Sequence, residues 1–419
     1  MAATIGVVGL GKLGLPIAVT LALQGHEVIA YDRDSSRMDL AALSALELGP
    51  DATSSLHACI GEDLPVRFAS LDELLSLVDC VFVVVDTPHG PTFEGITPLP
   101  DSRSDFGYVS LIAAVRSIVD AAPRPVEIGI MSTVLPGTIR SQILPLVGEH
   151  PLVYCPQFVA MGRVAADLLR PEFTLLGCGE QTAVMVPEIL GGLGSAKRFV
   201  VSYETAELAK VAYNTFVSAK VTVSNLVQWM AHETGADVLD VFRILRSADQ
   251  RLTSDAYLGP GMGDGGPCHP RDNIALSWLF RQKGAGADLF TDVMRARQAY
   301  VEWLGNAFRE YAGGLPLVLL GTAFKPGSDI QTGSSAVLMA TLLNQAGAAV
   351  TVAATKAHLS TLSLPAGAAA FFIGCPEPEF VEYPFPAGSV VVDPWCVVPD
   401  LDGVRVHRIG ATPVAYAQS

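Results

Sequence analysis

The chain has 419 residues, of which 50% are hydrophobic and 16% charged, a length that predicts two or three domains with separate cores. The formal net charge of −15 argues against nucleic acid as a partner, because the protein would repel phosphate backbones at long range. Seven cysteines without CxxC or metal-ligand spacing predict reduced thiols, no metal site and a cytoplasmic location. We expect no membrane span, because no apolar run reaches about 18 residues. We also expect no signal peptide, because MAATIGVVGLG enters a strand directly.

A pattern of strand, glycine loop, helix, strand and acid opens the chain. An apolar strand at Thr4–Val8 runs into GLGKLG at 9–14, a helix follows, and a second strand at Glu27–Tyr31 ends at Asp32. The glycines allow a tight turn, close approach of a pyrophosphate and close helix packing. A carboxylate at Asp32 would accept hydrogen bonds from a ribose and repel a 2′-phosphate, so the pattern predicts NAD rather than NADP. The predicted cofactor contacts here are Gly9, Gly11, Lys12, Leu13, Gly14, Asp32 and Arg33.

Strands and helices continue to alternate. Apolar strands are expected at Cys80–Val85, Ile128–Met131 and Leu152–Tyr154, with helical stretches between them, which predicts a doubly wound α/β sheet. Two strand ends carry hydroxyl groups, in DTP at 86–88 and STV at 132–134. Ligands bind outside the carboxyl ends of strands in such sheets, although the same threonines could instead cap the helices that follow. The further predicted cofactor contacts are Thr87, Pro88, Ser132 and Thr133.

A long helix is predicted from Glu204 to Gly235. Glu207, Lys210 and Asn214 fall at positions i, i+3 and i+7, so they share one face of this helix. The face is either a polar cluster presented to a cleft or an exposed polar stripe.

The segment at 259–272, GPGMGDGGPCHPRD, is too rich in glycine and proline for a helix interior or a central strand. Cys268 has little side-chain cover in this loop, and Arg271 and Asp272 follow it. A nearby cation favours the thiolate, so Cys268 is a candidate nucleophile. The alternative is a structural turn with a small buried cysteine.

A second α/β pattern without a glycine fingerprint begins at Pro316. We expect a helix at Ser335–Ala346 and strands at Ala349–Val352, Ala369–Ile373 and Ser389–Val392. The predicted fold class is therefore α/β, with an N-terminal Rossmann sheet, a central long-helix segment and a smaller C-terminal Rossmann-like domain. The predicted boundaries are 1–200 for the NAD-binding domain, 201–312 for a central helical dimerisation and catalytic-loop domain, and 313–419 for a substrate-nucleotide domain.

In combination, several motifs resemble those of the nucleotide-sugar 6-dehydrogenases, the family of UDP-glucose, UDP-N-acetylmannosamine and GDP-mannose dehydrogenases. The motifs are GLGKLGLP with Asp32, STVLPGT at 132–138, ETAELAKVAYN at 204–214, DQR at 249–251, the loop at 259–272, and AFKP at 323–326. The resemblance covers nearly the whole chain. It implies an NAD-dependent enzyme that oxidises a sugar CH₂OH group twice, through an aldehyde, a cysteine thiohemiacetal and a thioester, to a carboxylate.

The resemblance also implies roles for individual residues. Cys268 would be the nucleophile, and Lys210 would stabilise the developing oxyanion. Asn214 and Asp272 would position water and a proton, and Thr133 would hold the same water. Arg251 would reach the substrate of a neighbouring subunit, which implies a homodimer built on the long helix. The predicted substrate contacts are Gln157, Phe158, Met161, Lys210, Asn214, Arg251, Tyr257, Gly265 and Lys325.

The substrate half departs from the family pattern. Gln157 and Met161 stand where the family usually has two glutamates, and neither can take a proton. SDIQTGSS at 328–335 lacks an acid and an arginine of the usual segment, and DPW at 393–395 replaces the usual Asp-Gly-Arg. These departures predict a diverged member that acts on an unusual nucleotide sugar or a related phosphorylated sugar from specialised metabolism.

Three functions are compatible with this pattern. The leading one is oxidation of a primary alcohol of a nucleotide sugar, either to the acid or only to the aldehyde. Loss of the two glutamates favours a reaction that stops early. The second is epimerisation, in which tightly held NAD takes and returns a hydride. The third is a non-catalytic NAD-binding regulator or partner subunit.

Overall fold

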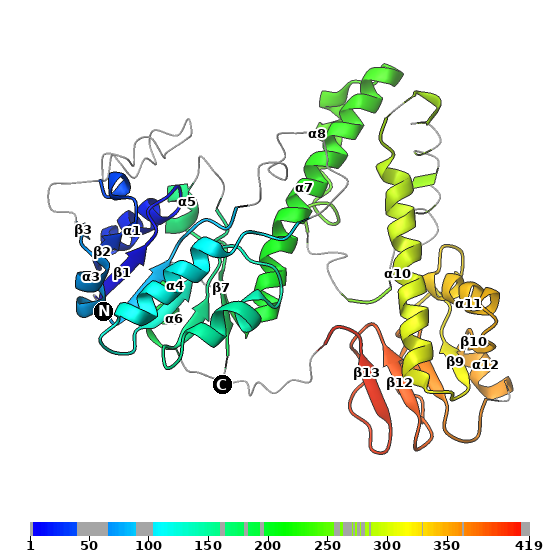
Figure 1. Cartoon of the computed structure of the whole chain (residues 1–419). Coiled ribbons are helices and arrows are strands. Elements are labelled where there is room, and N and C mark those ends of the chain that lie inside the picture. The colour runs from blue at the N-terminus through cyan, green and yellow to red at the C-terminus, as the bar shows by residue number, and fades with distance from the viewer. Residues whose placement is uncertain are drawn as a thin grey trace. The chain divides into compact units, whose positions relative to one another are not determined.

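Figure 1 shows a computed structural model of the chain. It describes residues 3–39, 66–88, 104–159, 164–179, 183–192, 197–254, 260–262, 270, 273–274, 277, 281–284, 286–328, 330–362 and 364–411. The chain divides into two compact units, Met1–Val223 and Ser224–Ser419, and each is described by itself.

An eight-stranded sheet forms the centre of the described part of the first unit (Figure 1). The strand order is β3-β2-β1-β4-β5-β6-β7-β8, and β6 and β7 form the antiparallel pair in an otherwise parallel sheet. The order reverses at β1, as in a doubly wound fold, and the carboxyl ends beside such a reversal are where ligands bind. The strands are β1 (Thr4–Val8), β2 (Glu27–Tyr31), β3 (Val66–Phe68), β4 (Cys80–Val83), β5 (Glu127–Ile130), β6 (Leu152–Tyr154), β7 (Thr174–Cys178) and β8 (Arg198–Ser202).

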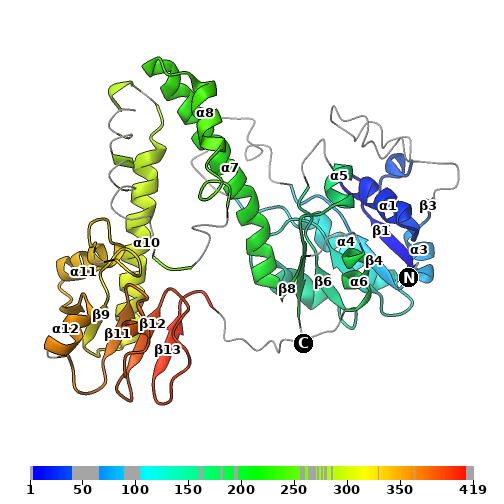
Figure 2. The ribbon, with the colours of Figure 1, turned by 180° about the vertical axis from the view of Figure 1, so that it is seen from behind.

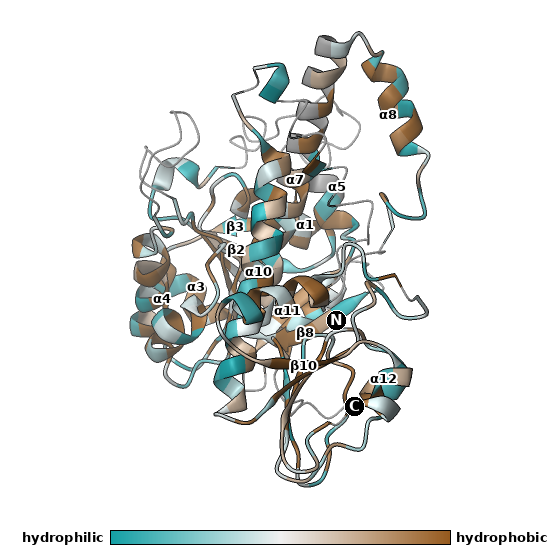
Figure 3. Ribbon diagram, turned by 90° about the vertical axis from the view of Figure 1, so that its right-hand side faces the viewer, coloured by the Kyte–Doolittle hydropathy of each residue, from teal (hydrophilic) through white to brown (hydrophobic). Residues whose placement is uncertain are grey.

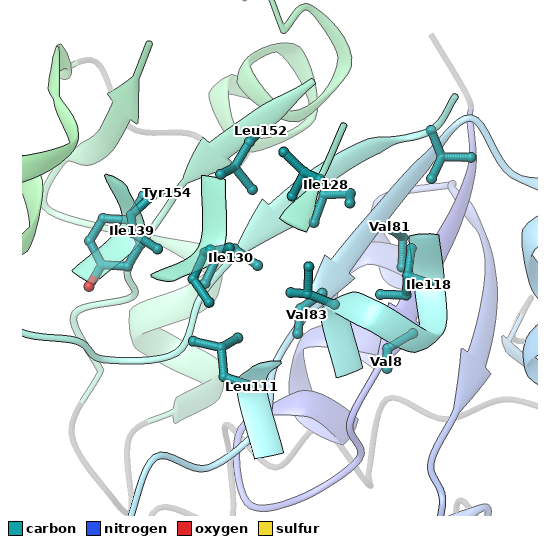
Figure 4. Packing of buried hydrophobic residues seen from close by; sticks show 14 of the residues in the cluster. Val8, Val81, Val83, Leu111, Ile118, Ile128, Ile130, Ile139, Leu152 and Tyr154 are labelled. Atoms are coloured by element: carbon teal, nitrogen blue, oxygen red, sulfur yellow. The ribbon is translucent and has the colours of Figure 1, made fainter. Parts of the chain in front are cut away.

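Helices cover both faces of this sheet because successive strand residues point to opposite sides. On one face, Ile5 and Phe82 pack in a cluster with α1, α5 and α6. On the other face, Val81, Leu111 and Ile128 pack in a cluster with α3, α4 and η6, and Figure 4 shows this second cluster from close by. The helical elements up to α6 in the described residues are α1 (Gly14–Leu23), η1 (Ser35–Arg37), α3 (Leu71–Leu77), α4 (Val109–Ala121), η6 (Ile139–Ile143), η7 (Leu144–Leu146), α5 (Val164–Leu169) and α6 (Met185–Gly191).

The long helix α7 (Tyr203–Thr234) follows β8 directly. Tyr203 is buried, and its hydroxyl group donates a 2.8 Å hydrogen bond to the Leu152 carbonyl oxygen, which ties the first turn of α7 to β6. The helix α8 (Val238–Arg246) comes next and begins at Asp237, whose carboxylate accepts from two backbone N–H groups of its first turn. In Figure 3, α8 carries hydrophobic and hydrophilic residues along its length.

The described part of the second unit has a five-stranded parallel sheet in the order β10-β9-β11-β12-β13, and Figure 2 shows β9, β11, β12 and β13 from behind. Helix α10 (Leu289–Ala312) packs against one face of this sheet through Leu304 and Phe308, and Gly313 ends it with a φ of 56°. The remaining elements are β9 (Leu317–Leu320), α11 (Ser335–Gln345), β10 (Val350–Ala353), α12 (Lys356–Thr361), β11 (Ala370–Ile373), α13 (Pro378–Val381), β12 (Val390–Asp393) and β13 (Arg405–Arg408).

The predicted fold class is confirmed, with a Rossmann sheet, a helical middle and a second parallel sheet. Strand bounds differ from the predicted ones by one or two residues. β5 begins at Glu127, for example, because the backbone of this residue pairs with Cys80 of β4. Its buried carboxylate accepts hydrogen bonds from the N–H groups of Val184, Met185 and Val186 at the start of α6. Among the described residues, no helix combines the length and the hydropathy needed to cross a membrane.

Candidate active site

The glycine loop after β1 has the geometry that its spacing predicts. Gly9 adopts a φ of 96°, a conformation that favours glycine. A Cβ atom on Gly14 would lie 1.8 Å from the Gly9 carbonyl oxygen, so only glycine fits there. At Gly11 a Cβ atom would meet only Arg37 Nη1 at 3.6 Å and Asp86 Oδ2 at 4.0 Å, which leaves the outer side of the loop open.

Asp32 is held by the backbone at the end of β2. Its Oδ2 accepts a 2.7 Å hydrogen bond from the Leu10 N–H group, and its Oδ1 accepts a 2.8 Å hydrogen bond from the Asp34 N–H group. The Arg37 Nη1 atom lies 3.9 Å from Oδ2. A carboxylate oxygen can accept more than one hydrogen bond, so Asp32 keeps acceptor capacity for a ligand.

A cavity of about 290 Å³ lies beside the glycine loop. Asp32 and Arg37 contribute a polar rim, and Leu71, Ala113 and Ala114 contribute an apolar wall, a combination that suits a ribose and a purine ring. These residues therefore fit the adenosine half of a dinucleotide. Of the predicted cofactor contacts, those that line the cavity are Gly9, Gly11, Asp32, Arg33 and Pro88, whereas Lys12, Leu13, Gly14, Thr87, Ser132 and Thr133 do not.

Two hydroxyl groups connect the loops that follow β4 and β5. The Thr87 Oγ1 donates a 2.7 Å hydrogen bond to the Thr133 carbonyl oxygen, and the Ser132 Oγ donates a 2.6 Å hydrogen bond to the Val85 carbonyl oxygen. In the described structure, Thr87 thus bonds across to the neighbouring strand end. The two bonds hold the Ser132-Thr133 segment against the carboxyl end of β4.

Lys210 is buried in the first half of α7, with 8% of its surface exposed. Its Nζ donates a 2.7 Å hydrogen bond to the backbone carbonyl oxygen of Gln157 and lies 4.9 Å from the centroid of the Phe158 ring. Burial lowers the pKa of this ammonium group from its ordinary value. The Tyr213 ring packs edge-on against Phe158, with centroids 5.0 Å apart, whereas Asn214 is exposed. The structure therefore brings Lys210, Gln157 and Phe158 together.

The side chain of Gln157 turns toward its own backbone. Its Nε2 donates a 2.9 Å hydrogen bond to the Cys155 carbonyl oxygen. A glutamate at this position could not make that bond, because a carboxylate has no hydrogen to donate. Gln157 therefore offers no proton acceptor, and its amide group is used locally.

Glu207, one turn before Lys210, is fully buried. Its Oε2 accepts a 2.6 Å hydrogen bond from the Gly137 N–H group, and its Oε1 accepts a 2.7 Å hydrogen bond from the Ile139 N–H group. Burial raises the pKa of this carboxyl group, and the two N–H donors oppose that effect.

Two predicted substrate contacts, Arg251 and Lys325, belong to the second unit, where both are exposed. The Lys325 Nζ lies 5.5 Å from the centroid of the Phe324 ring. The remaining predicted site residues, Met161, Tyr257, Gly265, Cys268 and Asp272, lie outside the described residues.

Trp395, in the turn that follows β12, contacts the segment that precedes Cys268 in the chain. A Cβ atom on Gly261 would lie 2.2 Å from the Trp395 ring, so the ring packs directly on this glycine. Tyr300 adds a 2.9 Å hydrogen bond from its hydroxyl group to the Gly261 carbonyl oxygen. The buried Asp393 accepts from the Trp395 N–H group at 2.9 Å, and the Trp395 indole N–H donates to the Ile373 carbonyl oxygen at 2.9 Å.

Sequence reasoning assigned no role to Arg37, Glu207 or Trp395. Arg37 could have been found from its position in the first turn after Asp32. The sequence places Glu207 on the face of Lys210, but its bond partners lie far away in the chain. The sequence marks Trp395 only by the missing arginine, because the contact of Trp395 with Gly261 has no local signal. Among the described residues, no group of three or more His, Cys, Asp or Glu side chains could hold a metal ion.

Comparison with known proteins places this geometry in context. Residues 3–190 match the NAD binding domain of the UDP-glucose/GDP-mannose dehydrogenase family, and residues 204–298 match its central domain. The UDP-glucose 6-dehydrogenase of Rhizobium meliloti is 28% identical over 83% of this chain and 80% of its own. The GDP-mannose 6-dehydrogenase of Pseudomonas aeruginosa is 26% identical over 81% of this chain and 78% of its own.

A solved structure shares the fold. The ternary complex of the Pseudomonas aeruginosa GDP-mannose dehydrogenase superposes with a TM-score of 0.81 and 22% sequence identity, covering 96% of this chain and 99% of that one. The predicted NAD cofactor is confirmed by the match to the NAD binding domain.

Proposed function

The chain belongs to the UDP-glucose/GDP-mannose dehydrogenase family and is an NAD-dependent oxidoreductase, and from this premise we propose that it oxidises the primary alcohol of a nucleotide sugar through Cys268. The observation that carries the proposal is the buried Lys210, held beside Gln157 and Phe158 on the helix that follows the cofactor domain. The names of the relatives, which are UDP-glucose and GDP-mannose 6-dehydrogenases, support a nucleotide sugar as substrate.

NAD, when bound, supplies the acceptor for the hydride that leaves the alcohol carbon, while the hydroxyl proton leaves to a base. The Cys268 thiolate adds to the resulting aldehyde carbon and forms a thiohemiacetal. This adduct passes its hydride to a second NAD, exchanged for the NADH formed first, and leaves a thioester on Cys268, and water then releases a carboxylate and the thiol.

Lys210 supports this chemistry as a fixed cation. A charged donor in a place shielded from water stabilises negative charge that develops on oxygen, and it needs no reorganisation when the reaction occurs. In the proposal, Lys210 stabilises the negative charge on the thiohemiacetal oxygen, and Thr133, Asn214 and Asp272 hold the water and the proton. The Phe158 ring, whose centroid lies 4.9 Å from the Lys210 Nζ, stabilises the ammonium group through a cation–π interaction.

The C-terminal sheet is proposed to hold the nucleotide half of the substrate. A cavity of about 340 Å³ lies at the carboxyl ends of β9, β10 and β11, where open parallel sheets bind ligands. Thr355, Lys356 and Glu377 give it a polar lining that can bond sugar hydroxyl groups. Replacing Thr355 with valine should then weaken nucleotide-sugar binding and leave NAD binding unchanged, and a titration with each ligand tests this.

The proposal includes a homodimer built on α7 and α8. Large apolar side chains are exposed along both helices, including Phe216 at 59%, Leu239 at 76% and Ile244 at 62%. Apolar surface of this kind is typical of interfaces. Sedimentation should show a dimer, and the double change of Leu239 and Ile244 to aspartate should give a monomer. A wild-type monomer at micromolar concentration would contradict this part of the proposal.

NADH formed per substrate consumed tests the function. The assay uses a panel of UDP-sugars, GDP-sugars and sugar phosphates, with product masses measured alongside. Two equivalents and a carboxylate mean full oxidation, and one equivalent with an aldehyde or a trapped thioester means that the reaction stops before hydrolysis. An isomer without net NADH would favour the epimerase alternative. No turnover of any sugar in the panel by the wild-type enzyme would contradict the proposal.

A further inference from the structure

Glu207 connects two parts of the candidate site that lie far apart in the chain. It belongs to α7, one turn before Lys210, and bonds the backbone N–H groups of Gly137 and Ile139 at 2.6 and 2.7 Å. These N–H groups open the helical stretch η6, where the first donors of a helix have no partner within the helix. A single carboxylate from another element satisfies both of them.

The segment that Glu207 holds begins with Ser132 and Thr133. On its sheet side, Ser132 bonds the Val85 carbonyl oxygen, and the Tyr108 hydroxyl group accepts from the Leu135 N–H group at 3.2 Å. On its helix side, the buried Glu207 bonds Gly137 and Ile139, and the more exposed Glu204 of α7 pairs with Arg140. Glu207 is therefore the buried link that fixes the segment relative to α7.

The next turn of α7 does the same for a second loop. Lys210 bonds the carbonyl oxygen of Gln157 in the loop that follows β6. Two successive turns of one helix thus fix the loops after β5 and β6, which carry Thr133 and Gln157.

We infer that Glu207 is a positioning residue, whose carboxylate fixes the Thr133 segment relative to Lys210. The inference rests on the proposed function, because Thr133 and Lys210 are catalytic only within it. Both oxygens of Glu207 bond backbone N–H groups and its side chain is fully buried, which assigns it a positioning role and not a contact with substrate. It acts through the geometry of the two residues that it connects.

The test compares Glu207→Gln and Glu207→Ala with the control Glu204→Gln. Glu204 lies one turn earlier on the same helix and pairs with Arg140 of the same segment, but its side chain is 38% exposed. The amide of Glu207→Gln accepts one of the two hydrogen bonds and turns an NH₂ group toward the other donor. We expect kcat to fall about 10- to 100-fold in Glu207→Gln, as misplaced catalytic groups do, with the Kd for NAD unchanged. The control should keep wild-type kcat.

Hydrogen exchange gives a measure that does not depend on turnover. In Glu207→Gln the amides of Gly137 and Ile139 should exchange faster than in the wild type, whereas Glu204→Gln should leave them protected. If the wild type turns over no sugar, the proposed function fails by itself, and this exchange result decides the inference. Unchanged exchange, or a lowered Tm with wild-type kcat in the folded Glu207→Gln enzyme, would overturn it. Glu207→Ala shows whether loss of both bonds has the larger effect on exchange.

Discussion

The Lys210 ammonium group donates its 2.7 Å hydrogen bond to the backbone carbonyl oxygen of Gln157, not to a carboxylate. Among the described residues, Lys210 has no salt-bridge partner, and the adjacent acid on its face, Glu207, is bonded to backbone N–H groups. The positive charge is therefore not neutralised by a described neighbour. A cation of this kind is suited to stabilise a negative charge that appears only during the reaction.

Replacement of Lys210 by methionine should lower kcat by about 10²- to 10³-fold, the loss typical for one oxyanion-stabilising donor. Methionine keeps the length of the buried chain, so the Kd for NAD and the Tm should stay close to those of the wild type. Steady-state NADH formation and a fluorescence titration with NAD measure the two effects. Lys220→Met, an exposed change on the same helix, is the control. Equal losses of kcat in both variants would contradict a specific role for Lys210.

The lowered pKa of Lys210 predicts a pH dependence. The charged form stabilises the oxyanion, so kcat should fall as pH rises through a pKa below the ordinary value of 10.5. The stability of the fold has the opposite pH dependence. The unfolded chain keeps the Lys210 proton up to a higher pH than the folded protein does, because burial lowers the pKa only in the folded state. The free energy of unfolding should therefore rise with pH between the lowered pKa and 10.5. A pH profile of kcat checks the first effect. If Lys210→Met shows the same fall of kcat at alkaline pH as the wild type, the assignment of that pKa to Lys210 is wrong.

Restoring acids at Gln157 and Met161 should speed thioester hydrolysis. A carboxylate at 157 cannot keep the bond to the Cys155 carbonyl oxygen, and the nearby Lys210 ammonium group attracts it. General base assistance contributes about 10²- to 10⁴-fold. The Gln157→Glu, Met161→Glu double variant should therefore release more carboxylate per thioester formed, measured by product mass after a single turnover. Gln157→Leu with Met161→Leu is the matched control, and equal hydrolysis in both pairs would rule out a role for these acids.

Much of the fold could be predicted because the strands that carry it are continuous apolar runs. β1, β4 and β6 are buried on both faces, and such runs are visible in the sequence. β3 and β13, which read VRF and RVHR, lie at sheet edges and mix charged with apolar residues, so the same criterion does not find them. The reversed direction of β7 has no local signal either, because it is set by pairing with β6.

The candidate site could be predicted only where its contacts are local. Gly9, Gly14 and Asp32 act within one strand-loop-helix unit, so their spacing specifies their geometry. Glu207 and Trp395 act on backbone groups that are distant in the chain. Contacts of that kind depend on packing between elements, and a single sequence does not encode them in any short pattern.

Asp32 should determine the affinity for NAD and its preference over NADP. Loss of the carboxylate in Asp32→Ala removes the anchor for the Leu10 and Asp34 N–H groups and the acceptor for a ribose hydroxyl. Hydrogen bonds to charged groups contribute about 1.5–3 kcal/mol, so the Kd for NAD should rise about 10- to 100-fold. The preference for NAD over NADP should shrink because a negative charge is gone. Isothermal titration with both cofactors measures this, with the exposed Asp120→Asn as control; an unchanged NAD to NADP ratio would contradict it.

Trp395 should influence the reactivity of Cys268 through the segment at Gly261. In Trp395→Ala the ring that packs on Gly261 is lost, together with the indole bond to the Ile373 carbonyl oxygen. Replacing a fully buried tryptophan with alanine lowers the free energy of unfolding by about 3 kcal/mol or more. Because Trp395 is only partly buried, the loss in Trp395→Ala should be smaller than about 3 kcal/mol. Trp395→Phe keeps an aromatic ring on Gly261 and loses the indole bond, so it separates packing from hydrogen bonding.

The alkylation rate of Cys268 by iodoacetamide, followed by mass spectrometry, reports on the segment without any substrate. If packing on Gly261 anchors the chain that leads to Cys268, the alkylation rate and kcat should change in Trp395→Ala and stay near wild type in Trp395→Phe. A change of the same size in both variants would assign the effect to the bond with Ile373 instead. Wild-type alkylation and kcat in Trp395→Ala, with only a lower Tm, would limit Trp395 to stabilising the second sheet.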